Sequence, residues 1–125
     1  MRGGTDIGRV RGLGAARQGT HHWWMMRVTS VAVLLLGVWF LAALLRLPDY
    51  GYETVTAWLA QPIVAVPMLL FVVSVFYHLH LGLVELIEDY VHGGARIAAH
   101  LALTAFAIAG GLLAVFSILK IALGA

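Results

Sequence analysis

Residues 77–92 of the chain are YHLHLGLVELIEDYVH, and this stretch decides what kind of helix the middle of the chain forms. It continues the apolar run VPMLLFVVSVF of residues 66–76 without a break. Together the two runs are long enough to cross a bilayer, which takes about 20 apolar residues. Yet residues 77–92 carry three histidines, two glutamates, one aspartate and two tyrosines. Ionisable groups within a membrane span pair, line cavities or bind a ligand, so the stretch predicts a functional helix face.

Helical geometry sorts these polar residues onto two sides. Each residue advances an α-helix by about 100°, so positions can be compared with His78 as the reference. Six residues fall within about 40° of one direction; they are Ser74, His78, Gly82, Glu85, Asp89 and His92. We call this set the polar stripe. His80 points about 160° away from it, toward the opposite side of the helix.

The composition of the whole chain fits an integral membrane protein. Of the 125 residues, 62% are hydrophobic and 11% are charged, whereas soluble domains carry roughly 25% charged residues. Since cysteine is absent, disulfides, thiolate metal sites and iron–sulfur ligation by this chain are excluded. Three apolar segments leave almost no room for a soluble catalytic domain. If the protein belongs to an enzyme, we expect most of the chemistry on other chains.

The expected fold is all-α, with three transmembrane helices. Two segments are predicted: residues 1–22 as a flexible basic arm and residues 23–125 as a three-helix membrane domain. The helices are predicted at about 23–45, 62–88 and 95–123. Proline at position 62 suits the first turn of a helix, and the pair Gly93-Gly94 ends the second span.

Charge distribution predicts the orientation. With three spans, the N-terminus shares one side of the membrane with the loop of residues 89–96. That side carries six arginines, against one arginine and one lysine on the other. The positive-inside rule therefore predicts a cytoplasmic N-terminus and a periplasmic C-terminus.

Two positions on the polar stripe suit a porphyrin. His78 lies deepest, about 16 Å along the helix from Asp89. Gly82, one turn on, leaves a flat groove that admits a planar ring or a neighbouring helix. Haem iron is commonly held by an axial histidine. An interhelical hydrogen bond at His78, with packing at Gly82, is an equally open interpretation.

The ends of the spans hold further candidates. Asp89 and Tyr90 lie at the interface, where they anchor the helix or contact a quinone. Arg27 lies about a turn inside the first span, suited to snorkelling or to binding an anion, with Glu85 and Asp89 among the candidates. His100 is expected to hydrogen-bond between helices or reach headgroups, with haem or quinone contact as the alternative.

Three features then coincide: GTHHWWMMRVTS at residues 19–30, His78-x-x-x-Gly82, and Asp89-Tyr90 beginning eleven residues after His78. In combination they resemble the D-type hydrophobic membrane anchor subunits of succinate dehydrogenase, respiratory complex II. The resemblance runs from about Gly12 to Gly93, followed by a generic third helix.

The resemblance implies a membrane subunit of succinate:ubiquinone oxidoreductase that helps to hold one haem b. His78 matches the axial ligand of the haem iron, and Arg27 and His21 match positions near the haem propionates. Tyr90 matches the tyrosine that hydrogen-bonds ubiquinone, and Asp89 its neighbouring acid.

The implied partners are a cytochrome b anchor subunit, an iron–sulfur subunit, a flavoprotein subunit and membrane lipid, with no nucleic acid. The implied location is the bacterial inner membrane. No catalytic residue or succinate site is expected on this chain. One alternative is a small helical proton-conducting or assembly subunit of another membrane complex; another is a fumarate reductase working in the reverse direction.

Overall fold

The computed structural model describes residue 7 and residues 18–124, and all the secondary structure in this part of the chain is helical. The helices are α2 (Gln18–Leu45), α3 (Tyr52–Leu59), α4 (Pro62–Tyr90) and α5 (Gly94–Ala122). Three of them, α2, α4 and α5, are long and apolar enough to cross a membrane. The predicted all-α fold with three spans is therefore confirmed.

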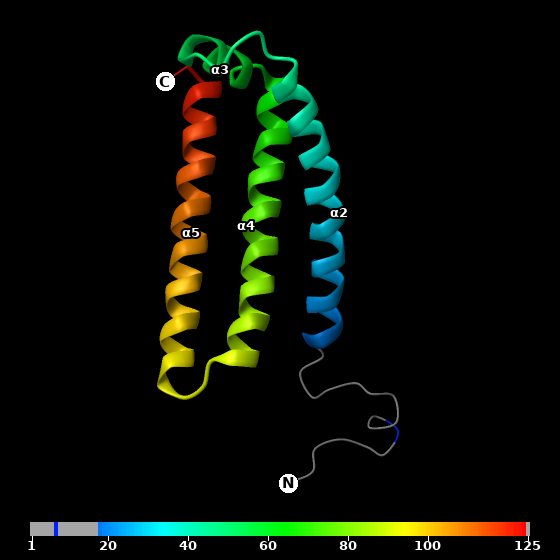
Figure 1. Cartoon of the computed structure of the whole chain (residues 1–125), viewed down its shortest axis with the longest axis vertical. Helices are drawn as coiled ribbons and strands as arrows, with labels where there is room; N and C mark the ends of the chain where they lie inside the picture. Colours follow the sequence, from blue (N-terminus) through cyan, green and yellow to red (C-terminus); the bar gives the residue numbers. More distant parts are fainter. Residues whose placement is uncertain (1–6, 8–17, 125) are drawn as a thin grey trace.

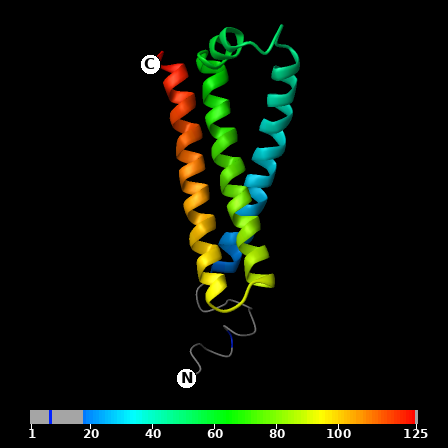
Figure 2. The same ribbon diagram turned by 60° about the vertical axis from the view of Figure 1, so that its left-hand side comes forward.

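Helix α4 is the centre of the arrangement. It packs against α2 on one side and against α5 on the other, while the described parts of α2 and α5 do not touch. The three long helices thus form an open row, with the short α3 across one end (Figure 1). Turning the molecule shows that α2 is inclined to α4 and crosses it toward the end of the row away from α3 (Figure 2).

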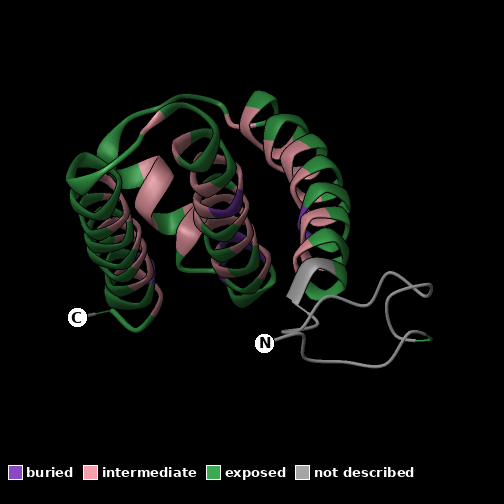
Figure 3. Ribbon diagram, turned by 90° about the horizontal axis from the view of Figure 1, so that it is seen from below, coloured by how far each residue is buried: buried purple, intermediate pink, exposed green. Residues whose placement is uncertain are grey.

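The apolar core lies at the end of the row where α3 packs. Ala65 and Met68 of α4 and Ile118 of α5 are buried there, and Trp39 and Trp58 pack against them from α2 and α3. Elsewhere most of the surface of the three long helices is exposed or half-buried, as seen from below, down the helices (Figure 3). Large apolar side chains are among the exposed ones.

Local sequence explains where the helices end. Pro62 occupies the start of α4 as predicted, because a helix needs no N–H there. Pro67 lies inside α4, yet the helix continues through it. Gly93 turns the chain from α4 into α5 with a φ of 69°, which residues other than glycine rarely adopt.

The connection between α2 and α3 contains a side-chain turn. The Gly51 N–H donates to Asp49 Oδ1 at 2.8 Å. This bond, with a weaker contribution from the Thr54 hydroxyl, lowers the pKa of the Asp49 carboxyl. The turn ends at Gly51, which is the N-cap residue of α3.

Two predicted boundaries differ from the structure. Helix α2 begins at Gln18, five residues before the predicted position 23, so residues 18–22 belong to the helix and not to the arm. Apolar residues mark only the part of a helix that lies inside the bilayer, and α2 continues beyond it by a polar turn. Helix α4 ends at Tyr90, so His92 is not part of its polar stripe. Of the predicted arm, residues 1–6 and 8–17 lie outside the described part of the chain.

Candidate functional site

A hydrogen bond joins α2 to α4 about midway along the length of α4. Thr29 Oγ1 lies 3.0 Å from His78 Nδ1. Thr29 is 6% exposed and is the one polar residue in the buried class among those whose burial is described. His78 is half-buried. The polar stripe of α4 therefore faces α2 at this level.

The other contacts of Thr29 favour one direction for this bond. Thr29 Oγ1 also lies 2.7 Å from the carbonyl oxygen of Met25 and 3.2 Å from that of Met26. A hydroxyl has a single proton to donate, and both carbonyls can only accept. When that proton goes to the Met25 carbonyl, the oxygen accepts from His78 Nδ1–H. His78 is then the tautomer whose Nε2 carries a lone pair.

Open space lies beside His78 at Gly82. A Cβ atom built at Gly82 would meet no atom within 4 Å among the described residues. Gly82 follows His78 by one helical turn on nearly the same face. The space at this glycine is therefore open, and no helix among the described residues fills it.

A second polar contact joins the same two helices. His22 Nε2 lies 2.7 Å from Glu85 Oε1. His22 precedes Thr29 by seven residues and Glu85 follows His78 by seven, as expected for two antiparallel helices in one register. Two turns of helix, about 10 Å, separate the two contacts.

Neither Arg27 nor His21 takes part in these contacts. The Arg27 guanidinium carbon lies 5.2 Å from the centre of the Trp23 ring, a cation–π geometry. Arg27 is exposed and does not pair with Glu85, which pairs with His22. His21 is exposed on α2. The interpretation of Arg27 as the partner of Glu85 is therefore wrong.

The end of α4 is open to its surroundings. Tyr90 is 76% exposed, and Asp89 is also exposed. Next to them, Arg96 Nη2 of α5 lies 3.7 Å from Glu88 Oε1 of α4. Tyr90 and Asp89 are thus accessible from outside the chain, but no described residue of α2 or α5 forms a hydrogen bond to them.

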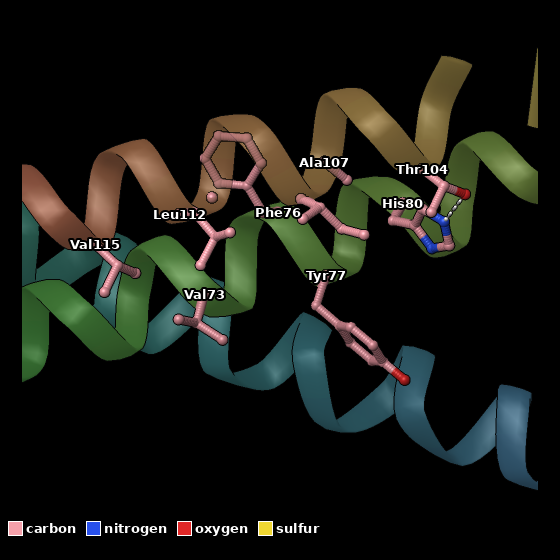
Figure 4. Close-up of a pocket in the computed structure, with 10 residues that line it drawn as sticks. Val73, Phe76, Tyr77, His80, Thr104, Ala107, Leu112 and Val115 are labelled. Atoms are coloured by element: carbon pink, nitrogen blue, oxygen red, sulfur yellow. Dashed lines mark hydrogen bonds between the residues drawn. The ribbon is translucent and has the colours of Figure 1, made fainter. Parts of the chain in front are cut away.

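His80 lies on the other side of α4, as the helical angles predict. Its Nε2 is 3.4 Å from Thr104 Oγ1 of α5. Both residues line one end of a pocket of about 470 Å³ between α4 and α5, whose remaining lining is apolar except for Tyr77 (Figure 4). His78 and His80 therefore face different helices.

Close packing of α4 against α5 depends on Gly110, which the sequence alone did not predict. A Cβ at Gly110 would lie 2.8 Å from Phe76 Cε1, closer than real contacts allow. At Gly111 the nearest atom would be Phe76 Cγ at 3.8 Å, an ordinary contact. The tightest contact between the two helices is thus at Gly110.

Comparison with known proteins places the chain in a family. Residues 1–119 match the family described as "Succinate dehydrogenase/Fumarate reductase transmembrane subunit". The chain belongs to this family. A succinate dehydrogenase hydrophobic membrane anchor subunit of Paracoccus denitrificans is 34% identical over 116 residues, covering 93% of this chain and 90% of the relative.

A second similar protein carries the same description. The succinate dehydrogenase hydrophobic membrane anchor subunit of Rickettsia bellii is 31% identical over 86 residues, which is 69% of each chain. No solved structure matches. The resemblance stated from the sequence motifs is confirmed, and so is the expectation of a multi-pass membrane anchor of succinate dehydrogenase, distinct from the flavin subunit.

The sequence did not predict Thr29 or His22 as members of the site. The available signal was their spacing: the seven residues from His22 to Thr29 equal the seven from His78 to Glu85. Such a match becomes informative only once α2 and α4 are known to be antiparallel neighbours.

Proposed function

We propose that this membrane anchor holds one face of a b-type haem through His78, as one of two axial ligands of the iron. The supporting observation is the hydrogen bond of His78 Nδ1 to Thr29, which leaves Nε2 as the coordinating nitrogen. Metal-ligating histidines use their second nitrogen in this way. The open space at Gly82 fits the approach of a planar ring. The bound haem would supply a one-electron redox centre.

The second axial ligand belongs to a partner in this proposal. The row is open on both broad faces, and large apolar side chains are exposed along it. We assign one face to a cytochrome b anchor subunit and the remaining apolar surface to lipid. Such a surface needs apolar surroundings.

We further propose that the end of α4 forms part of a ubiquinone site. Tyr90 can donate a hydrogen bond from its hydroxyl to a quinone carbonyl, and Asp89 can relay protons. Their exposure supports contact with a molecule outside the chain. Arg27 and His21, exposed at the start of α2, are proposed to lie near the haem propionates. Arginine suits such carboxylates because it is permanently charged.

Charge supports a cytoplasmic position for this end of the row. The start of α2 lies at the same end as the turn between α4 and α5 (Figure 1), and that end carries most of the arginines. The positive-inside rule then places it in the cytoplasm. The iron–sulfur and flavoprotein subunits would dock there, passing electrons from succinate to ubiquinone in the bacterial inner membrane.

The experiment that tests this function is purification of the complex through a tag on this chain. The proposal predicts a second membrane subunit with its own histidine, the two soluble subunits, and a b-type absorption spectrum on reduction. A complex with none of these, but with proton conduction in vesicles, would support the alternative of a proton-conducting subunit.

A further inference from the structure

We propose that Thr29 is a positioning residue for the haem ligand, fixing the tautomer and ring orientation of His78. The inference rests on the proposed haem ligation by His78. It adds a role for a residue of a different helix, which does not itself touch the iron or the porphyrin ring.

The first argument is the burial of Thr29. Threonine hydroxyls in helices often bond to the carbonyl four residues earlier, so the contact with Met25 is by itself unremarkable. Ser30, the next residue, makes the same kind of bond to Met26 at 2.7 Å and is exposed. Thr29 differs because its oxygen is buried and also contacts a ring nitrogen of α4.

The second argument is the consequence of the Met25 bond for the proton on His78. At 2.7 Å this bond engages the only proton of the Thr29 hydroxyl. If His78 carried its proton on Nε2 instead, the hydroxyl would have to turn from Met25 and donate to Nδ1. The hydrogen bond from the Thr29 hydroxyl to the Met25 carbonyl therefore favours the His78 tautomer with Nδ1–H, in which Nε2 can bind iron.

The third argument concerns the iron. A hydrogen bond accepted from the second nitrogen makes an imidazole ligand more basic and fixes its plane. A more basic ligand stabilises ferric over ferrous iron. Removing the acceptor should therefore raise the midpoint potential of the haem and weaken its retention, with the ligand itself still present.

The test uses the whole complex and variants that differ by the hydroxyl alone. Thr29→Val keeps the shape and removes the acceptor. Thr29→Ala and Thr29→Ser both remove the methyl and differ only in the hydroxyl, so they serve if Thr29→Val does not assemble. Ser30→Ala is the matched control, since it removes an equivalent backbone bond that has no contact with His78.

Two readouts are measured: the redox titration of the haem and the rate of haem transfer to excess apomyoglobin. We expect Thr29→Val and Thr29→Ala to raise the midpoint potential of the haem and to make its transfer to apomyoglobin about tenfold faster. Tenfold is the lower end of the effect of losing a partner that hydrogen-bonds a metal ligand. Thr29→Ser and Ser30→Ala should resemble the wild type. Equal values for Thr29→Ser and Thr29→Ala, or an unchanged Thr29→Val, would overturn the inference. Retention of haem in His78→Ala would instead overturn the proposed function.

Discussion

Glu85 Oε1 of α4 accepts a hydrogen bond from His22 Nε2 of α2 at 2.7 Å, two helical turns from the contact between Thr29 and His78. The two contacts define the register of the antiparallel helices. They lie where the row has little apolar core, because the buried cluster is at the α3 end. Side-chain polar contacts therefore hold α2 against α4 near the site.

We expect His22→Ala to lower the thermal midpoint of the purified complex slightly. Both side chains are partly exposed, and such pairs contribute about 0.2–1 kcal/mol. Glu85→Gln should have a smaller effect because an amide can still bond to the ring. His92→Ala, which removes an exposed histidine beyond the end of α4, is the control. If His92→Ala is as damaging as His22→Ala, the pair has no specific role.

Gly110 and its neighbour Gly111 should respond oppositely to alanine. In Gly110→Ala the new methyl meets the Phe76 ring at 2.8 Å, so the ring must move, at a cost of about 1–3 kcal/mol. In Gly111→Ala the contact is an ordinary 3.8 Å, and alanine favours the helix by roughly 0.5–1 kcal/mol. Thermal midpoints of the two variants test this, and equal midpoints would contradict the packing described between α4 and α5.

Gly82→Leu should leave the helices intact but reduce haem content. Nothing described lies within 4 Å of a Cβ at this position, so the side chain would start in open space beside the described helices. The proposed haem would need the same space. The measurement is the haem to protein ratio of the purified complex, with Gly82→Ala as the smaller change. Full haem content in Gly82→Leu would show that the ring lies elsewhere.

Tyr90→Phe should slow quinone reduction about tenfold, because a lost hydrogen bond of about 1.4 kcal/mol corresponds to that factor. Succinate oxidation with a soluble artificial acceptor should be unchanged, since that reaction does not use the quinone site. Assaying both activities on one preparation separates the outcomes. Loss of both would indicate failed assembly, and retention of both would remove Tyr90 from the quinone site.

Sequence reasoning predicted those features that follow from a single helix. The three spans follow from apolar length, the reversal at Gly93 from its conformational freedom, and the opposite directions of His78 and His80 from the helical angle. Each of these depends only on residues near one another in the chain.

Features that depend on two helices were not predictable in the same way. The partner of Glu85 is His22 and not Arg27, because a pairing depends on the register and rotation of α2 against α4. The start of α2 at Gln18 was missed because polar residues can continue a helix past the membrane. The close approach at Gly110 depends on the rotation of α5 toward Phe76. One sequence leaves these rotations open.

The central claim, that His78 is the haem ligand, is tested most directly by reduced-minus-oxidised spectra of two variants of the whole complex. His80 is the matched control, two residues away but on the α5 side of α4. The account predicts that the b-type signal disappears or becomes high-spin in His78→Ala and stays unchanged in His80→Ala. An unchanged b-type spectrum in an assembled His78→Ala complex would contradict it.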